Sequence, residues 1–261
     1  MTIKRAIVVG ATSGIGCELA KAFSSHGYEV GVAGRRSSLL EKLSRELPTR
    51  TCAAVIDVRD TEAAIVSLEK LIADMDGVDI IVISAGTGHV NPSLDWMAEK
   101  DTIDTNVSGF AAVADAAMRH FLQKGSGHLA GISSVAGARG DGMAPAYNAS
   151  KAFISNYLEG LRKKAVKEGL PITVTDIRPG FVDTAMMKSY ADDVSAGPRP
   201  ASPDRARSKG DGFFWVAPPE KAAAQIYEAI RRKKKRAYVT RRWAIAAWLL
   251  RTMPDSIYNR I

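Results

Sequence analysis

At 261 residues the chain is long enough for one large domain or two small ones, and its 46% of apolar residues exclude a chain too polar to bury a core. The 25% of charged residues are ordinary for a globular protein. A formal net charge of +8 allows nucleic acid, an anionic membrane or a phosphorylated ligand as partner, and it does not choose among them.

The two cysteines, Cys17 and Cys52, lie far apart in the sequence and outside any CxxC pair. The four histidines form no cluster with metal-ligand spacing. We therefore expect no disulfide framework, no metal site and a reducing, cytoplasmic setting. The first residues, MTIKR, lead directly into AIVVG, without the apolar run of a signal peptide.

Short apolar runs alternate with longer amphipathic ones along the whole chain. We predict strands over residues 3–9, 29–33, 52–56, 79–84, 128–132, 172–177 and 237–239, and helices over 14–25, 38–47, 61–73, 97–123, 149–167 and 219–232. This alternation implies right-handed crossovers between parallel strands, with helices on both faces. The expected fold is a single α/β, Rossmann-like, doubly wound domain with a mostly parallel sheet of about seven strands.

One stretch, residues 183–216, is irregular and contains Pro198, Pro200 and Pro203. A loop of this length in a compact domain is usually a lid, a binding loop or a disordered excursion. No Pro- or Ser-rich linker and no internal repeat divides the chain. We predict one domain over residues 1–240, which includes this loop, followed by an apolar and basic extension over residues 241–261.

The segment VVGATSGIG ends the first predicted strand and opens the first predicted helix. Its Gly10, Gly14 and Gly16 allow a tight turn, a close backbone approach to a pyrophosphate and tight packing of the helix on the strand. The helix N-terminus adds N–H donors and the positive end of the dipole. The spacing predicts a dinucleotide site, with a ligand-free glycine turn as the alternative.

The residues after the second predicted strand distinguish the two nicotinamide cofactors. An acidic residue there suits the ribose 2′-hydroxyl of NAD, whereas an arginine suits the 2′-phosphate of NADP. This chain has no carboxylate at that point and continues with Arg35 and Arg36. Two solvated helix-start residues are the alternative interpretation, but the pair favours NADP because a guanidinium binds phosphate in bidentate fashion.

Tyr147 and Lys151 are four residues apart, so on a helix they would share one face. A free tyrosine titrates near pH ~10, which is too high for a base at neutrality, and a nearby ammonium lowers that pKa. Tyr147 can then exchange a proton with a substrate oxygen while hydride moves at the adjacent carbon. Ser134 can hydrogen-bond the same oxygen.

With these motifs the chain resembles the short-chain dehydrogenase/reductase family in its compact form, from residue 3 to about residue 239. The match includes the glycine turn, the pair Asp57-Val58, the Ser84-Ala85-Gly86 element with serine in place of the family's usual asparagine, and Arg178-Pro179-Gly180 with Thr184. The resemblance implies a catalytic set of Asn106, Ser134, Tyr147 and Lys151.

Each of these positions has a role implied by the family. Tyr147 would be the general acid/base, Lys151 would bind the nicotinamide ribose and depress the Tyr147 pKa, and Ser134 would orient the substrate oxygen. Asn106 would interrupt its helix and hold a water that links Lys151 to solvent. Motifs and resemblance together predict an NADP(H) site made of Gly10, Thr12, Ser13, Gly14, Ile15, Gly16, Arg35, Arg36, Asp57, Val58, Ser84, Ala85, Gly86, Asn106, Tyr147, Lys151, Pro179, Gly180, Val182 and Thr184.

The function expected is an NADP(H)-dependent oxidoreductase that transfers hydride between nicotinamide and a small-molecule alcohol or carbonyl substrate. A non-catalytic NADP-binding sensor is one alternative, and a membrane-surface reductase of lipid, retinoid or steroid-type substrates is another. A lyase or epimerase of the wider superfamily is disfavoured by the compact length and the glycine spacing. The resemblance also implies a homodimer or homotetramer, paired through the helices at 97–123 and 149–167.

Three side chains near these motifs have a structural and a functional interpretation. Ser133 is expected to be a structural residue at a strand end rather than a catalyst. His89 is expected to be an exposed loop histidine rather than part of the substrate wall. Cys17 is expected to pack under the glycine turn, although its position in a first helical turn could also lower its thiol pKa.

The tail RRKKKRAYVTRRWAIAAWLLRTMPDSIYNRI is the least typical part of the resemblance. Its apolar segment 243–250 is too short to span a bilayer, which needs about twenty residues. Its tryptophans and arginines could place it at a membrane surface as a peripheral contact. We favour docking onto the substrate loop or another subunit, because an apolar helix end is usually buried, and we expect no nucleic acid partner.

Overall fold

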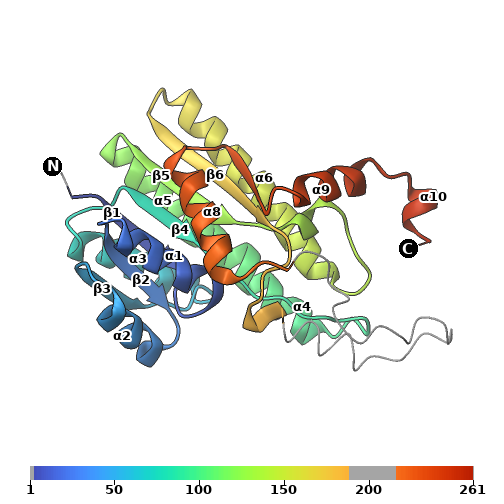
Figure 1. Ribbon diagram of the computed structural model, residues 1–261, viewed down its shortest axis with the longest axis horizontal. Coiled ribbons are helices and arrows are strands. Elements are labelled where there is room, and N and C mark those ends of the chain that lie inside the picture. The colour runs from blue at the N-terminus through green and yellow to red at the C-terminus, as the bar shows by residue number, and fades with distance from the viewer. Residues whose placement is uncertain (1–2, 188–215, 261) are drawn as a thin grey trace.

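The computed structural model of the protein describes residues 3–187 and 216–260. The predicted loop at 183–216 therefore lies mostly outside the described residues, and only its two ends are considered below. The described residues form one α/β domain around a parallel sheet, with two short helices of the C-terminal extension beside it (Figure 1).

The sheet has seven parallel strands in the order β3-β2-β1-β4-β5-β6-β7, which confirms the predicted fold class. Val- and Ile-rich strands suit such a sheet because both of its faces are buried. The strands are β1 (Arg5–Val9), β2 (Glu29–Gly34), β3 (Thr51–Val55), β4 (Ile80–Ile83), β5 (Gly127–Ile132), β6 (Ile172–Pro179) and β7 (Arg236–Val239).

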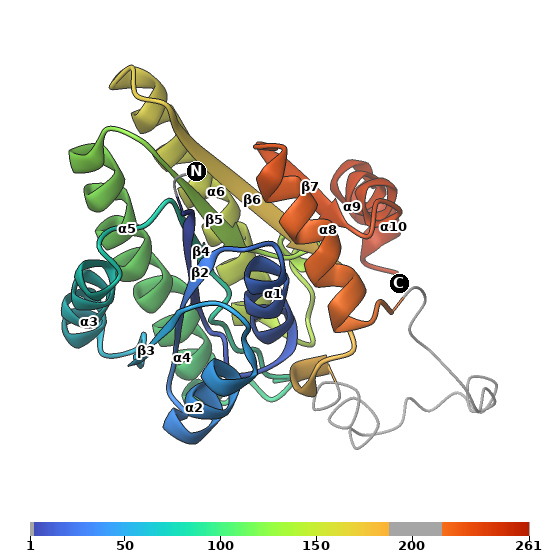
Figure 2. The same cartoon turned by 60° about the vertical axis from the view of Figure 1, so that its left-hand side comes forward.

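Helices cover both faces of the sheet, as Figure 2 shows for α1 and α8 on one side and α3 and α5 on the other. One buried cluster joins the sheet to α1 (Gly14–Ser25), α2 (Ser37–Glu46) and α8 (Pro219–Arg231). A second cluster joins it to α3 (Thr61–Asp74), α5 (Phe110–Lys124) and α6 (Pro145–Lys167). The predicted helices therefore bury their apolar faces against the sheet from both sides.

The prediction of a single helix over residues 97–123 is wrong. The segment consists of α4 (Trp96–Ile103), a π-helical turn at Asp104–Gly109 and α5. The turn contains Asn106, and its Gly109 lies so close to the Val58 carbonyl that a Cβ there would be 2.5 Å from the oxygen. The family resemblance implied a break of the helix at Asn106, and the π-helical turn agrees with it, whereas the hydrophobic pattern used to predict the helix did not mark the break.

Helix α6 begins earlier than predicted, with Pro145 in its first turn, where a missing N–H costs nothing. Tyr147 therefore lies in the first turn of the same helix as Lys151. The apolar segment of the extension forms α9 (Trp243–Thr252), which packs against β7 and the 3₁₀ turn Val135–Ala138, and α10 (Asp255–Tyr258) follows. None of the helices within 3–187 and 216–260 is both long enough and apolar enough to cross a bilayer.

A buried histidine, His128, lies near the start of β5, away from the carboxyl ends of the strands. Its Nε2 is 2.8 Å from Thr175 Oγ1, and that hydroxyl donates to the Lys234 carbonyl. The hydroxyl therefore accepts from the Nε2–H tautomer of His128. Burial, with a smaller contribution from Lys233, lowers the pKa of His128 to about 4.

This pKa predicts a loss of stability in mild acid. The unfolded chain binds more protons than the folded chain between the free value near 6.5 and the folded value of about 4, so stability falls as pH drops through this window. The total loss from this group is roughly 3 kcal/mol. Urea unfolding of wild type and His128→Gln at pH 7 and pH 5 measures the part of this loss that falls above pH 5, about 2 kcal/mol. An equally steep loss in both proteins would assign the acid sensitivity to other groups.

Candidate active site

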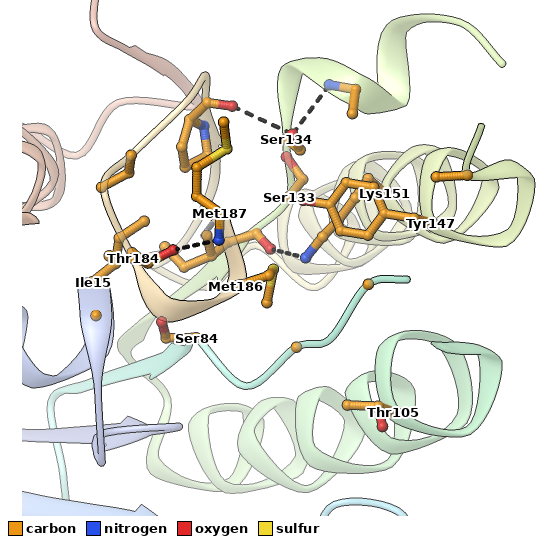
Figure 3. Close-up of a pocket in the computed structure, with 18 of the residues that line it drawn as sticks. Ile15, Ser84, Thr105, Ser133, Ser134, Tyr147, Lys151, Thr184, Met186 and Met187 are labelled. Carbon is orange, nitrogen blue, oxygen red and sulfur yellow. Dashed lines mark hydrogen bonds between the residues drawn. The ribbon is translucent and has the colours of Figure 1, made fainter. Parts of the chain in front are cut away.

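The carboxyl ends of six strands meet around one pocket of about 900 Å³. The strand order reverses between β1 and β4, and in open parallel sheets the ligand crevice lies at such a point. The loops that follow β1 to β6 all contribute to the pocket wall. Figure 3 shows this pocket in close-up, with Ser134, Tyr147 and Lys151 facing the segment that carries Thr184, Met186 and Met187.

Most of the predicted site residues line this pocket. They are Gly10, Thr12, Ser13, Gly14, Ile15, Arg35, Arg36, Asp57, Val58, Ser84, Ala85, Gly86, Ser134, Tyr147, Lys151, Pro179, Gly180, Val182 and Thr184. Gly16 and Asn106 are the two that do not line it. Gly16 packs behind the turn, where a Cβ would lie 2.2 Å from the Gly10 carbonyl oxygen, and Asn106 is fully buried.

The glycine turn brings the β1 backbone against the segment after β4. Gly10 has φ 93°, and a Cβ on it would lie 2.4 Å from the backbone nitrogen of Ala85. Ser13, the N-cap of α1, makes no side-chain capping bond, and Gly14 and Ile15 of the first turn line the pocket. The helix thus presents its N-terminal N–H groups where a phosphate fits.

Arg36 lies directly against the glycine turn. Its guanidinium donates to Thr12 Oγ1 at 2.7 Å and to Ser13 Oγ at 2.8 Å. Arg35 and Arg36 are both exposed and line the pocket at the end of β2. At the end of β3, hydrogen bonds from Arg59 hold the pKa of Asp57 below its ordinary value. This corner therefore presents guanidinium groups, and its carboxylate is already paired.

Lys151 is a buried ammonium beside the Tyr147 ring. Its side chain comes from the second turn of α6, its Nζ donates to the Ile132 carbonyl at 3.2 Å, and the residue is only 4% exposed. The Nζ lies 5.6 Å from the centre of the Tyr147 ring. Burial lowers the pKa of Lys151 to about 8, so the group is cationic at neutral pH and loses its proton in mild alkali.

Asn106 connects the loop after β4 to the start of α6. Its Oδ1 accepts from the Thr87 backbone N–H at 2.9 Å, and its Nδ2 donates to the Thr87 carbonyl at 2.7 Å and to Ser150 Oγ at 3.0 Å. Ser150 Oγ in turn donates to the Tyr147 carbonyl at 2.7 Å. A Cβ on Gly88 of this loop would lie 2.5 Å from the Tyr147 ring. The network therefore holds the Tyr147 ring against the loop.

The two serines after β5 have different surroundings. Ser133 Oγ is buried and donates to Asp176 Oδ1 at 2.5 Å, within a buried network that continues to Arg178. Ser133 also lines the pocket, but its hydroxyl is bound within this buried network, which is consistent with the structural role expected for it. Ser134 lies at the pocket, where its Oγ accepts from the Ala136 N–H at 3.1 Å and is 3.4 Å from the Pro179 carbonyl. Its hydroxyl hydrogen can rotate toward a substrate oxygen.

The structure also shows the surroundings of His89 and Cys17, the other two residues with alternative interpretations. His89 does line the pocket, contrary to expectation, and its partly exposed ring is 2.8 Å from Asp101. Cys17 packs against the buried cluster under the glycine turn. Burial raises the pKa of its thiol, so the alternative of a lowered thiol pKa is wrong.

One wall of the pocket comes from the C-terminal extension, and the set of site residues predicted from the sequence omitted it. Trp243, Leu250 and Tyr258 line the pocket. The Trp243 indole packs edge-on against Phe181, and a Cβ on Gly180 would lie 2.0 Å from its nitrogen.

Arg139, in the loop that leads to α6, holds this extension against the rest of the domain. It donates to the Leu250 carbonyl at 3.1 Å, to the Met253 carbonyl and to Asp255, and its guanidinium stacks on the Tyr258 ring at 3.9 Å. Tyr258 donates back to the Gly140 carbonyl at 2.6 Å. The only sequence signal for this wall was the unexplained run of tryptophan and leucine, because the family motifs end before it.

Comparisons with known proteins identify relatives of this chain. The family model for short chain dehydrogenases matches residues 4–195. An uncharacterized oxidoreductase of Myxococcus xanthus is 38% identical over 191 residues, which are 71% of this chain and 75% of the relative.

Solved structures share the fold. A variant of actinorhodin polyketide ketoreductase with NADPH aligns with a TM-score of 0.78 and 24% identity, over 91% of this chain and 95% of its own. ElxO with NADP bound aligns with a TM-score of 0.74 and 18% identity, over 91% of this chain and 97% of its own. At these identities the two structures show a common architecture.

Proposed function

The chain belongs to the short-chain dehydrogenase/reductase family of oxidoreductases, and we propose that it is NADP(H)-dependent and acts on an alcohol or carbonyl carbon through Tyr147. The observation that carries this proposal is the placement of Tyr147, Ser134 and the buried Lys151 in the same pocket as the glycine turn. A proton donor, a hydroxyl that can orient an oxygen and a dinucleotide cradle together support hydride transfer.

The pocket fits a nicotinamide dinucleotide. The uncapped first turn of α1 would hold the pyrophosphate, and the absence of a side chain on Gly10 allows the turn before this helix to pack directly against the backbone of Ala85. Lys151 would bind the ribose hydroxyls next to the nicotinamide. When bound, the reduced nicotinamide supplies the hydride, and the protein supplies positioning and proton transfer.

The side chains of the pocket would transfer the proton and orient the substrate. Tyr147 would donate its proton to the substrate oxygen as negative charge develops there, and Ser134 would hold the same oxygen in place. The Lys151 ammonium, 5.6 Å from the Tyr147 ring, would stabilise the phenolate left behind. Asn106 would act as a positioning residue, since its bonds run through Thr87 and Ser150 to the backbone of Tyr147.

The preference for NADP rests on the basic corner after β2. Arg35 and Arg36 are exposed at the pocket, and Arg36 already binds the hydroxyls of the glycine turn, so a 2′-phosphate there would meet guanidinium groups. Two proteins of the same fold have been solved with NADPH or NADP, which is consistent with this choice.

We expect wild type to bind NADPH more tightly than NADH, and Arg35→Ala/Arg36→Ala to lose most of this preference. Loss of two charge-assisted contacts should weaken NADPH binding by about 10²-fold and leave NADH nearly unchanged. Fluorescence titration of both nucleotides measures this. The control is Arg45→Ala/Arg50→Ala, which removes two exposed arginines outside the pocket. Equal affinity of wild type for the two nucleotides would overturn the NADP preference, and no binding of either would overturn the proposed function.

A further inference from the structure

Helix α9 has two apolar faces, and only one of them is covered. Trp243, Ala247 and Leu250 follow a spacing of four and three residues and face the domain, where the outer two line the pocket. On the opposite face, Ile245 is 65% exposed, Trp248 is 63% exposed and Leu249 is 49% exposed.

An exposed face of this kind is unusual for a surface helix. A surface helix normally turns polar residues outward, and a helix that is apolar all round is normally buried. Ile257 of α10 is also exposed, at 51%, so the apolar surface includes both short helices of the extension. Within residues 3–187 and 216–260, nothing covers this surface.

A basic groove lies beside α9. It is lined by residues of α8 and β7 and by the residues that lead into α9, and it has a volume of about 1040 Å³. Six of its lining side chains are basic and one is acidic: Lys221, Arg232, Lys234, Arg236, Arg241 and Arg242 against Glu228. Glu228 is already paired with Arg231 and Arg232, so the groove carries a net positive charge.

The groove and the apolar face adjoin each other. Ala244 lines the groove, and Trp248, four residues later, lies on the same side of α9. Arg251, one turn after Ala247 and exposed, adds a cation at the other end of the helix. The extension therefore combines exposed aliphatic side chains, an exposed tryptophan and flanking arginines. Its two helices, α9 and α10, lie at one end of the molecule (Figure 1).

We propose that the exposed face of α9 and the basic groove beside it seat the protein on an anionic lipid surface. Aliphatic side chains would enter the acyl boundary, the Trp248 indole would lie at headgroup level, and the basic groove would receive the phosphates. Charge decides between occupants, because a second copy of this chain that paired through the same face would bring an equally basic surface against the groove.

This placement has a consequence for the substrate, which rests on the proposed function. The inner face of α9 lines the pocket while its outer face would contact lipid, so the pocket wall and the membrane contact are two sides of one helix. Phe181, Met186 and Met187 add apolar surface to the pocket. A carbonyl compound that partitions into the bilayer is the substrate class that fits both surfaces.

Vesicle co-sedimentation tests the lipid surface without any need for turnover. The two vesicle types are phosphatidylcholine alone and phosphatidylcholine with about one-third phosphatidylglycerol. Wild type should sediment with the anionic vesicles, and Ile245→Ser/Trp248→Ser/Leu249→Ser should bind them at least about tenfold more weakly. Its matched control, Val55→Ser/Val66→Ser/Val166→Ser, removes three apolar side chains with exposures of 60%, 66% and 76% elsewhere and should bind like wild type. Arg241→Ser/Arg251→Ser should also bind about tenfold more weakly.

Three results would overturn the proposal. These are no sedimentation of wild type, equal sedimentation with neutral and anionic vesicles, or a wild-type dimer in solution that the α9 triple variant converts to a monomer. NADPH titration and thermal unfolding of each variant show that the fold and the nucleotide site are intact. If the lipid surface holds, anionic vesicles should speed reduction of a dissolved long-chain aldehyde by wild type but not by the triple variant. Vesicle binding without turnover of any carbonyl compound would leave the lipid surface standing and overturn the proposed function.

Discussion

Tyr147→Phe should lower the turnover number for carbonyl reduction by about 10²–10⁴-fold, because a positioned general acid contributes on that order. The ring stays, so its packing against the loop at Gly88 is retained, and only the proton-bearing oxygen is lost. NADPH binding should change by less than about threefold, since a single neutral hydrogen bond contributes little net free energy. Steady-state kinetics with a panel of carbonyl compounds, combined with NADPH titration, measures both effects.

The matched control is Tyr157→Phe on the same helix. The Tyr157 hydroxyl donates to Asp115 at 2.6 Å, and this residue does not line the pocket. Its loss should leave turnover within about threefold of wild type. If Tyr147→Phe retained turnover as well as the control does, Tyr147 would not be the proton donor and another group in the pocket would have to serve.

Lys151→Met should have two opposite effects: it should lower turnover by about 10²-fold or more, and it should make the folded protein more stable at pH 7. Turnover falls because the cation beside the Tyr147 ring is lost together with the ribose contact proposed above. Stability rises because an ammonium held at 4% exposure pays a desolvation cost that a methionine of similar length avoids.

The sign of the stability effect follows from the pKa. Burial lowers the pKa of Lys151 from about 10.5 to about 8, so the unfolded chain binds more protons than the folded chain between these pH values. Wild-type stability therefore gains from this group as pH rises from 8 to 10.5, and at pH 7 the burial cost is fully present. The shift corresponds to roughly 3 kcal/mol, which is the upper bound for the gain in Lys151→Met.

Urea unfolding of wild type and Lys151→Met at pH 7 and pH 10 measures this effect. The advantage of the variant should be largest at pH 7 and should shrink toward pH 10. Lys163→Met, at an exposed position of the same helix, is the control and should shift neither turnover nor the pH dependence of stability. A Lys151→Met protein that is less stable than wild type at pH 7 would show that Lys151 supports the fold rather than straining it.

Some features of this protein were determined by sequence alone, because they depend on neighbouring residues. The alternation of apolar strands and amphipathic helices specified a parallel sheet with two covered faces. Gly10, at φ 93°, marks a turn that a side chain would block, and Tyr147 and Lys151 share a helix face because of their spacing. The carboxyl ends of the strands and the first turn of α6 then bring Gly10, Arg36 and Tyr147 to one edge of the sheet, because parallel strands all point the same way.

Other features were decided only by tertiary contacts between distant segments. The pattern of Tyr147 and Lys151 is common on exposed helices, and what distinguishes this lysine is its burial below the Ile132 carbonyl, which no local pattern encodes. The π-helical turn at Asn106 depends on hydrogen bonds to Thr87 and Ser150, across 19 and 44 residues of chain.

The C-terminal wall of the pocket is the clearest case. Arg139 contacts the Leu250 carbonyl across 111 residues, and the Trp243 indole lies against Gly180 because a glycine leaves that space open. The sequence showed an apolar helix with two candidate faces and could not tell which one would be buried. The shape of the pocket wall decided which face is buried. One face of α9 packs against Phe181 and the loop around Arg139, and the opposite face is left to solvent or to a partner.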